Sequence, residues 1–227
     1  MAVAVITGAT SGIGYALAQR LAEKYQVVGC GREAERVALL RQQHPTWDLQ
    51  VADLTQPSAR AAFAQHILRT YSEIEVLIHN AGRYAPGNLI DEGEGAYEEM
   101  VAINLSSAYH LTRLLLGRFR AQRRGRIVFI GSVAAVQAYA SGVAYSVAKA
   151  GLLALARNLR QILKEYGVGV THLTLGATYT RSWMGTNLPR ERFIPPEAVA
   201  ELIWSLIHLP PSVVVEDVVV RPLAGDI

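Results

Sequence analysis

The chain has 227 residues, of which 51% are hydrophobic and 18% are charged. This composition excludes a disordered chain and suits one well-buried core, and no apolar run reaches the roughly 18 residues that a membrane span needs. The net charge is only +3, and a single cysteine, Cys30, excludes an internal disulfide. Because the first residues enter a strand pattern without a basic leader, we expect a cytoplasmic protein with no membrane partner.

Strand and helix patterns alternate along the whole chain. The sequence first predicts a strand over 2–6, a helix over 12–24, a strand over 26–30, a helix over 33–43, a strand over 49–52 and a helix over 57–70. It then predicts a strand over 75–79, a helix over 95–122, a strand over 126–131, a helix over 143–166, a strand over 168–175, a helix over 195–208 and a strand over 213–220. This order predicts a three-layer α/β fold, in which a seven-stranded, mostly parallel sheet carries helices on both faces. We expect residues 1–227 to form a single domain.

A glycine-rich segment joins the first predicted strand to the first helix. Gly8 permits a tight turn, Gly12 lets the backbone approach a pyrophosphate, and Gly14 allows close contact between helix and strand. The helix N-terminus adds free N–H groups and a positive partial charge. An ordinary turn is the alternative, but the strand–loop–helix context favours a dinucleotide site in a Rossmann-type fold. We assign contacts with the dinucleotide to Gly8, Thr10, Ser11, Gly12, Ile13 and Gly14.

The end of the second predicted strand bears on the choice of cofactor. An acidic residue there binds the adenosine ribose hydroxyls and repels a 2′-phosphate, whereas this chain has Arg32. A guanidinium makes charge-assisted contacts with phosphate and stacks on adenine, so we expect NADP(H) rather than NAD(H). A surface arginine that opens the next helix is the alternative. In the first interpretation, Ser11 adds a hydroxyl contact to the same phosphate.

Tyr145 and Lys149 lie four residues apart on a predicted helix and therefore share one face. A tyrosine normally ionises near pH ~10. The Lys149 ammonium and the positive ring of an oxidised nicotinamide should lower that pKa, so that Tyr145 exchanges a proton with a substrate oxygen. Ser132, at the end of a predicted strand, could hold the same oxygen. A surface pair on a helix is the alternative for Tyr145 and Lys149 taken alone.

Together these motifs resemble the short-chain dehydrogenase/reductase family over essentially the whole chain. The family's catalytic tetrad matches Asn104, Ser132, Tyr145 and Lys149. The resemblance implies that Asn104 holds a helix bend and a water, and that Lys149 also binds the nicotinamide ribose. It further implies cofactor contacts for Asp53, Leu54, Asn80, Ala81, Gly82, Gly176, Thr178 and Thr180, besides Tyr145 and Lys149.

Two positions depart from the family pattern. His79 stands where the family often has asparagine, and we expect it to be structural, because no second metal ligand lies at a suitable spacing. Leu175 replaces the usual proline, which removes a restraint on φ in the loop that carries Thr178 and Thr180. We expect no bound metal.

The substrate side is less specific in sequence. We expect residues 181–194 to cover the substrate, because they follow the carboxyl end of a strand, where ligands bind in open α/β sheets. Aromatic and apolar side chains favour an apolar or ring-containing substrate, although each could equally pack a lid or a subunit contact. The residues expected to line the pocket are Tyr84, Val133, Gln137, Tyr139, Trp183 and Met184.

The predicted function is interconversion of a carbonyl and an alcohol, with hydride exchanged with NADP(H). A non-catalytic NADP(H) sensor or scaffold is the alternative, and an epimerase or dehydratase is a third possibility. The family resemblance also implies a homodimer or homotetramer. Five arginines between residues 118 and 126 are interpreted as a solvated helix end and not as a nucleic-acid site, because no aromatic residues interleave with them.

Overall fold

The computed structural model describes residues 2–227 and contains a seven-stranded sheet in the order β3-β2-β1-β4-β5-β6-β7. Every strand pairing is parallel, so the expectation of a mostly parallel sheet is met in full. The strands are β1 (Val3–Thr7), β2 (Gln26–Gly31), β3 (Asp48–Val51), β4 (Val76–His79), β5 (Gly125–Ile130), β6 (Val168–Leu175) and β7 (Asp217–Val220). β7 begins four residues later than predicted, because residues 213–216 run outside the ladder.

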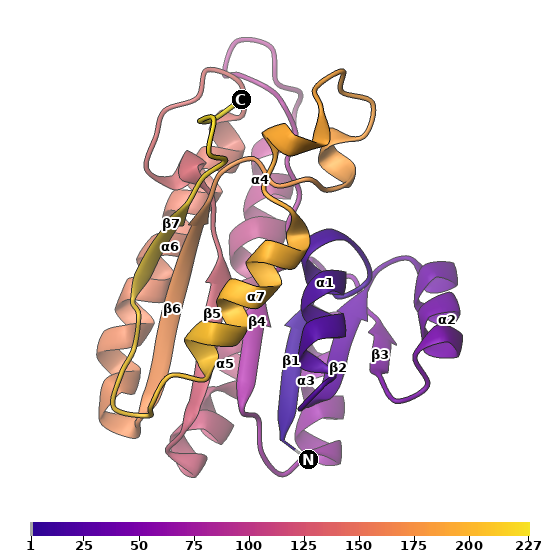
Figure 1. The fold of residues 1–227 in the computed structure, drawn as a ribbon, viewed down its shortest axis with the longest axis vertical. Helices are drawn as coiled ribbons and strands as arrows, with labels where there is room; N and C mark the ends of the chain where they lie inside the picture. Colours follow the sequence, from indigo (N-terminus) through magenta and orange to yellow (C-terminus); the bar gives the residue numbers. More distant parts are fainter. Residues whose placement is uncertain (1) are drawn as a thin grey trace.

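Helices cover both faces of this sheet (Figure 1). One face carries α1 (Gly12–Leu21) and α7 (Pro196–Ile207), which pack against each other, and α2 (Ala34–Gln43) lies beside β3. The other face carries α3 (Pro57–Thr70), α5 (Ser107–Gln122) and α6 (Val143–Leu163). The short helix α4 (Ala96–Val101) packs against α6.

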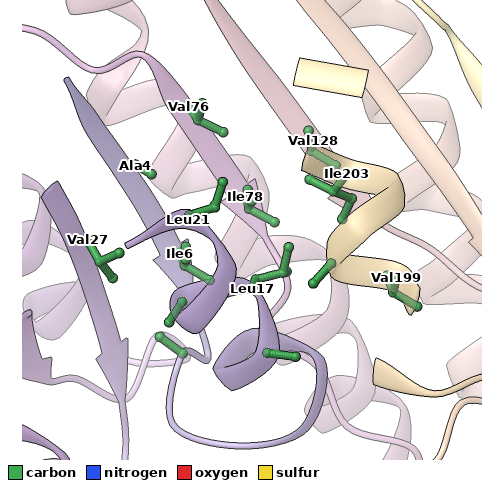
Figure 2. Packing of buried hydrophobic residues seen from close by; sticks show 14 of the residues in the cluster. Ala4, Ile6, Leu17, Leu21, Val27, Val76, Ile78, Val128, Val199 and Ile203 are labelled. Carbon is green, nitrogen blue, oxygen red and sulfur yellow. The ribbon is translucent and has the colours of Figure 1, made fainter. Parts of the chain in front are cut away.

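Two apolar clusters, one on each face, hold the layers together. Alternate residues of a buried strand point to opposite faces, so Ala4 and Ile6 of β1 belong to one cluster, while Val3 and Val5 belong to the other. In Figure 2, Leu17 of α1 and Ile203 of α7 lie over Ile6, Ile78 and Val128 of the central strands. This packing fixes the strand ends from which the loops of the site leave.

The long helix predicted over 95–122 is interrupted. Residues Ala102–Ser106 form a π-helical segment between α4 and α5, with Asn104 buried at its centre. Apolar spacing does not distinguish an α-helix that continues from one with a single wide turn, which is why the sequence predicted an unbroken helix. Such π-segments often occur at functional sites.

The arginines of residues 118–126 bind backbone carbonyl groups and neighbouring side chains. Arg118 donates to the carbonyl oxygens of Leu68, Tyr71 and Ser72, and Arg126 donates to those of Leu209 and Pro210. The cluster therefore ties loops at the amino end of the sheet to the helices. Among residues 2–227, no helix combines the length and the apolar character needed to cross a bilayer.

Candidate active site

A cleft of about 740 Å³ opens at the carboxyl ends of the parallel strands. Loops after β1, β2, β3, β4, β5 and β6 line it, as expected for ligand sites in open α/β sheets. It brings together most of the residues predicted for the site: Gly8, Thr10, Ser11, Gly12, Ile13, Arg32, Asp53, Leu54, Asn80, Ala81, Gly82, Tyr84, Asn104, Ser132, Val133, Tyr139, Tyr145, Lys149, Gly176, Thr178, Thr180 and Trp183.

The glycine loop forms a cradle that side chains would fill. Gly8 and Gly12 have φ of +67° and +51°, a left-handed conformation that favours glycine. A Cβ on Gly14 would overlap the carbonyl oxygen of Gly8 and lie 2.5 Å from Asn80 Nδ2. Gly14 does not line the cleft, so its predicted role is limited to close packing of α1 beneath the loop. These glycines leave backbone N–H groups facing the cleft at the start of α1, which suits a pyrophosphate.

Asn80 fastens this loop to the end of β4. Its Nδ2 donates to the carbonyl oxygens of Thr7 and Gly8, at 3.0 and 3.1 Å. The Thr7 hydroxyl in turn accepts hydrogen bonds from the backbone N–H groups of Asn80 and Ala81, both at 3.0 Å. The loop is therefore held in shape by protein contacts alone.

Arg32 is exposed at the rim of the cleft, directly after β2. Asp53, after β3, accepts hydrogen bonds from the Thr55 backbone N–H at 2.9 Å and from its hydroxyl at 2.8 Å. Asp53 thus closes a turn and also lines the cleft, where the family resemblance implies a cofactor contact. Glu33 lines the same rim and is ion-paired with Arg181. No pattern in the sequence indicated Glu33 as a site residue.

Tyr145 lies near the N-terminus of α6, with Ser132 of the loop after β5 and Tyr84 around it. A hydrogen bond with Ser132 contributes to the pKa of Tyr145, and the Tyr84 ring meets the Tyr145 ring edge-on, with centroids 5.3 Å apart. Ser132 Oγ also accepts a hydrogen bond from the Ala134 backbone N–H at 3.1 Å, which fixes the serine rotamer. The two hydroxyls therefore converge at one point of the cleft.

Lys149 is buried one helical turn along α6. Its Nζ donates to the carbonyl oxygen of Ile130 at 3.0 Å and lies 5.6 Å from the centroid of the Tyr145 ring. Burial lowers the pKa of Lys149 to about 8. An ammonium has three donors, so two remain for other partners.

In the protein alone, the pKa of Tyr145 lies above the ordinary value for a tyrosine. Burial is the largest cause, Ser132 opposes the rise and Tyr84 adds to it. The lowering that we expected also involves an oxidised cofactor, so it stays a prediction. Lys149 Nζ donates to the Ile130 carbonyl oxygen and lies on the side of the Tyr145 ring. In the protein alone, the Tyr145 phenol is therefore protonated at neutral pH.

Asn104 uses its amide to hold the segment after β4. Its Nδ2 donates to the carbonyl oxygens of Arg83 and Met100, at 2.8 and 3.1 Å, and its Oδ1 accepts the Arg83 backbone N–H at 3.1 Å. A Cβ on Gly82 would lie 2.7 Å from that Oδ1 and 3.5 Å from Lys149 Nζ. The π-helical turn thus brings the tetrad asparagine close to the tetrad lysine across a glycine.

The substrate wall differs in part from the prediction. Tyr84, Val133, Tyr139 and Trp183 line the cleft, whereas Gln137 and Met184 are exposed outside its lining. Gln137 Oε1 accepts a hydrogen bond from Arg221 at 3.1 Å, and Arg221 is ion-paired with Asp226, which does line the cleft. No local pattern could have revealed Asp226, because it reaches the site only through the fold.

Residues 175–194 run from the carboxyl end of β6 to the start of α7 (Figure 1), and the part up to Trp183 contributes to the lining of the cleft. Ile194 N donates to Ala177 O and Tyr179 N donates to Ile194 O, both at 2.9 Å, so the two ends of the segment are joined. Thr180 lies against the glycine loop, with its Cγ2 3.1 Å from the place of a Cβ on Gly12. The backbone before Arg181 is therefore well anchored despite Leu175 in place of proline.

His79 lies behind the site and has a structural environment. Its Nε2 is 2.7 Å from the Thr112 hydroxyl, and its ring stacks on Phe129 with centroids 4.8 Å apart. Burial lowers the pKa of His79 to about 3, so the ring is neutral at physiological pH. In the described part of the chain, no three His, Cys, Asp or Glu side chains gather as metal ligands would.

Residues 2–191 match the family model described as short chain dehydrogenase. The chain belongs to the short-chain dehydrogenase/reductase family. It is 29% identical over 239 residues to a sepiapterin reductase of Chlorobaculum tepidum, covering 99% of this chain and 98% of that protein. The family membership identifies the protein as an oxidoreductase with a Rossmann-type fold.

Two solved structures share this fold. An alcohol dehydrogenase of the archaeon Thermococcus sibiricus, complexed with 5-hydroxy-NADP, has a TM-score of 0.88 and 26% identity, covering 98% of this chain and 97% of that one. A metagenomic short-chain oxidoreductase in complex with NADP has a TM-score of 0.85 and 28% identity, covering 97% of this chain and 96% of that one. Both relatives therefore bind NADP-type cofactors.

Proposed function

We propose that this short-chain dehydrogenase/reductase interconverts a carbonyl and an alcohol with NADP(H), with Tyr145 as the acid/base. The observation that carries the proposal is the convergence of Tyr145, Ser132 and Lys149 in one cleft with the glycine loop. The glycine loop suits a dinucleotide, because Gly8 and Gly12 line the cleft in a left-handed conformation at the start of α1, where free N–H groups favour a phosphate. The NADP-type cofactors of the two similar structures support the same choice.

The residues of this chain divide the chemistry as follows. A bound nicotinamide nucleotide supplies the hydride in reduction and accepts it in oxidation. Tyr145 donates its phenol proton to the carbonyl oxygen as negative charge develops there, and Ser132 donates a hydrogen bond to the same oxygen. The Lys149 ammonium beside the ring stabilises the phenolate that remains. Because burial keeps Tyr145 protonated, reduction is favoured at neutral pH, and oxidation should accelerate as the pH rises.

The substrate enters between the Tyr84, Tyr139 and Trp183 side chains, with residues 181–194 covering it. Aromatic walls suit an apolar or ring-containing carbonyl compound. The name of the sepiapterin reductase relative is compatible with a ring-bearing substrate, and both similar structures carry oxidoreductase names. We further propose that the protein acts as one domain, assembles as a homo-oligomer and works in the cytoplasm.

The test is a panel of ketones and aldehydes offered with NADPH, following the absorbance of the reduced nicotinamide. A Tyr145→Phe variant should lose roughly 10²-fold or more in kcat, because general acid catalysis contributes about that much, while it still binds NADP⁺. Tyr97→Phe is the matched control, since Tyr97 is exposed on α4 and does not line the cleft. Full activity in Tyr145→Phe would refute the assigned role.

The cofactor preference has its own test. An Arg32→Ala variant should weaken NADPH binding about 10-fold or more, because a charge-assisted hydrogen bond to phosphate is lost, and it should change NADH binding much less. Isothermal titration calorimetry with both nucleotides measures this difference. Equal weakening of both nucleotides would contradict the proposed contact with a 2′-phosphate.

A further inference from the structure

An ion pair between distant parts of the sequence crosses the rim of the cleft. Arg181 Nη1 lies 3.0 and 3.2 Å from the two carboxylate oxygens of Glu33. Glu33 stands directly before α2 and next to Arg32, and all three side chains line the cleft. The pair therefore joins the covering segment, residues 181–194, to the rim where Arg32 lies.

Neither side chain of this ion pair has a role in the secondary structure around it. Glu33 occupies the N-cap position of α2, yet its side chain makes no capping hydrogen bond and binds Arg181 instead. Arg181 follows Thr180, which is held against the glycine loop, so the guanidinium reaches Glu33 from an anchored backbone. Both side chains are more than half exposed, and exposed pairs contribute little to folding stability.

Without Arg181, the charges of Arg32 and Glu33 at this rim would act on a phosphate in opposite directions. Arg32 attracts a phosphate, whereas the adjacent Glu33 carboxylate repels it, so without a third charge the two would largely cancel. Arg181 neutralises Glu33 and leaves the charge of Arg32 uncompensated. Two further charged side chains lie nearby, and each makes hydrogen bonds with uncharged groups. Arg36 donates to the Thr10 carbonyl oxygen at 3.2 Å, and Asp53 accepts hydrogen bonds from Thr55.

We propose that Arg181 is a specificity residue, which screens Glu33 and thereby allows Arg32 to select a nucleotide that carries a 2′-phosphate. This inference rests on the proposed NADP(H) preference. It makes the covering segment part of cofactor discrimination as well as of substrate binding. Arg181 acts through Glu33 and does not itself bind the phosphate.

Calorimetric Kd values for NADP⁺ and NAD⁺ at low ionic strength test the proposal on four proteins: wild type, Arg181→Gln, Glu33→Gln and the double variant. Arg181→Gln should raise the Kd for NADP⁺ about three- to ten-fold and the Kd for NAD⁺ less than about two-fold. The reason is that only NADP⁺ carries the additional phosphate charge that Glu33 would repel. In the Glu33→Gln background, the same change should alter the Kd for NADP⁺ by less than about two-fold.

Arg190→Gln is the matched control. It removes an equal charge from the same segment, but Arg190 lies 4.5 Å over the Tyr179 ring and does not line the cleft, so both Kd values should stay the same. Circular dichroism melting verifies that each variant is folded.

Three results would overturn the proposal. Equal weakening of both nucleotides by Arg181→Gln would mean a general role in closing the cleft. A loss of NADP⁺ affinity that persists in the Glu33→Gln background would mean a direct phosphate contact. A wild type that prefers NAD⁺ would remove the proposed cofactor preference together with this inference, whereas a preference for NADP⁺ that Arg181→Gln leaves unchanged would reject the inference alone.

Discussion

Replacing Lys149 by methionine should change how stability depends on pH. Burial lowers the pKa of Lys149 to about 8 in the folded chain, whereas an unfolded lysine titrates at 10.5. The unfolded state therefore binds more protons between these values, so the wild type gains stability as the pH rises through this window. From pH 7 to pH 10 the gain is roughly 2–3 kcal/mol, since each pKa unit corresponds to about 1.4 kcal/mol. Methionine has no proton to exchange and should lack this gain.

Urea unfolding of the wild type and Lys149→Met at half-unit pH steps measures the difference directly. The contributions of the other titrating groups cancel when the free energy of unfolding of the variant is subtracted from that of the wild type. Lys164→Met is the matched control, because Lys164 is exposed and binds only Gln161 on the same surface. A difference between wild type and Lys149→Met that stays constant from pH 7 to pH 10 would show that Lys149 is not held in a desolvating site, and the reasoning would fail.

Two further substitutions test the glycine cradle and the buried histidine. Gly14→Ala should destabilise the fold by about 1–3 kcal/mol, because its Cβ overlaps the Gly8 carbonyl, whereas Gly117→Ala, with open space around it on α5, should stabilise by about 0.5–1 kcal/mol; equal effects in urea unfolding would contradict the close packing. His79 has a pKa of about 3 when folded and 6.5 when unfolded, so the wild type should lose about 2 kcal/mol more than His79→Asn between pH 7 and pH 5. Parallel acid-unfolding profiles would show that His79 is not held neutral by burial.

The sequence predicted the parts of the site that depend on local geometry. A glycine-rich segment after a strand predicts a tight loop wherever a strand is followed by a helix. Two residues four apart on a helix, such as Tyr145 and Lys149, share one face in any helix. The fold class followed from the alternation of strand and helix patterns along the chain. The two apolar clusters, one on each face of the sheet, confirm the predicted three layers. The position of the cleft then follows from the rule that ligands bind beyond the carboxyl ends of the strands in open α/β sheets.

The features that the sequence did not predict depend on tertiary contacts or on competing energies. Asp226 enters the cleft from the far end of the chain, and Glu33 meets Arg181 only across the fold. The π-helical turn at Asn104 keeps the apolar spacing of an α-helix, so no local pattern marks it, and the bend at Asn104 was implied only by the family resemblance. In the protein alone, burial raises the pKa of Tyr145, and the extent of burial cannot be read from spacing.

The bonds that Asn80 and Thr7 make beneath the glycine loop have a consequence for engineering. Since protein groups already hold the loop in its working shape, a nucleotide that enters it does not have to order it and loses little affinity to entropy. In the proposed function, the loop that would hold the diphosphate is thus separate from the rim residues that would contact the adenosine end of the nucleotide. Exchanging Arg32 and Glu33 for other side chains should therefore retune nucleotide choice without rebuilding the floor of the cleft.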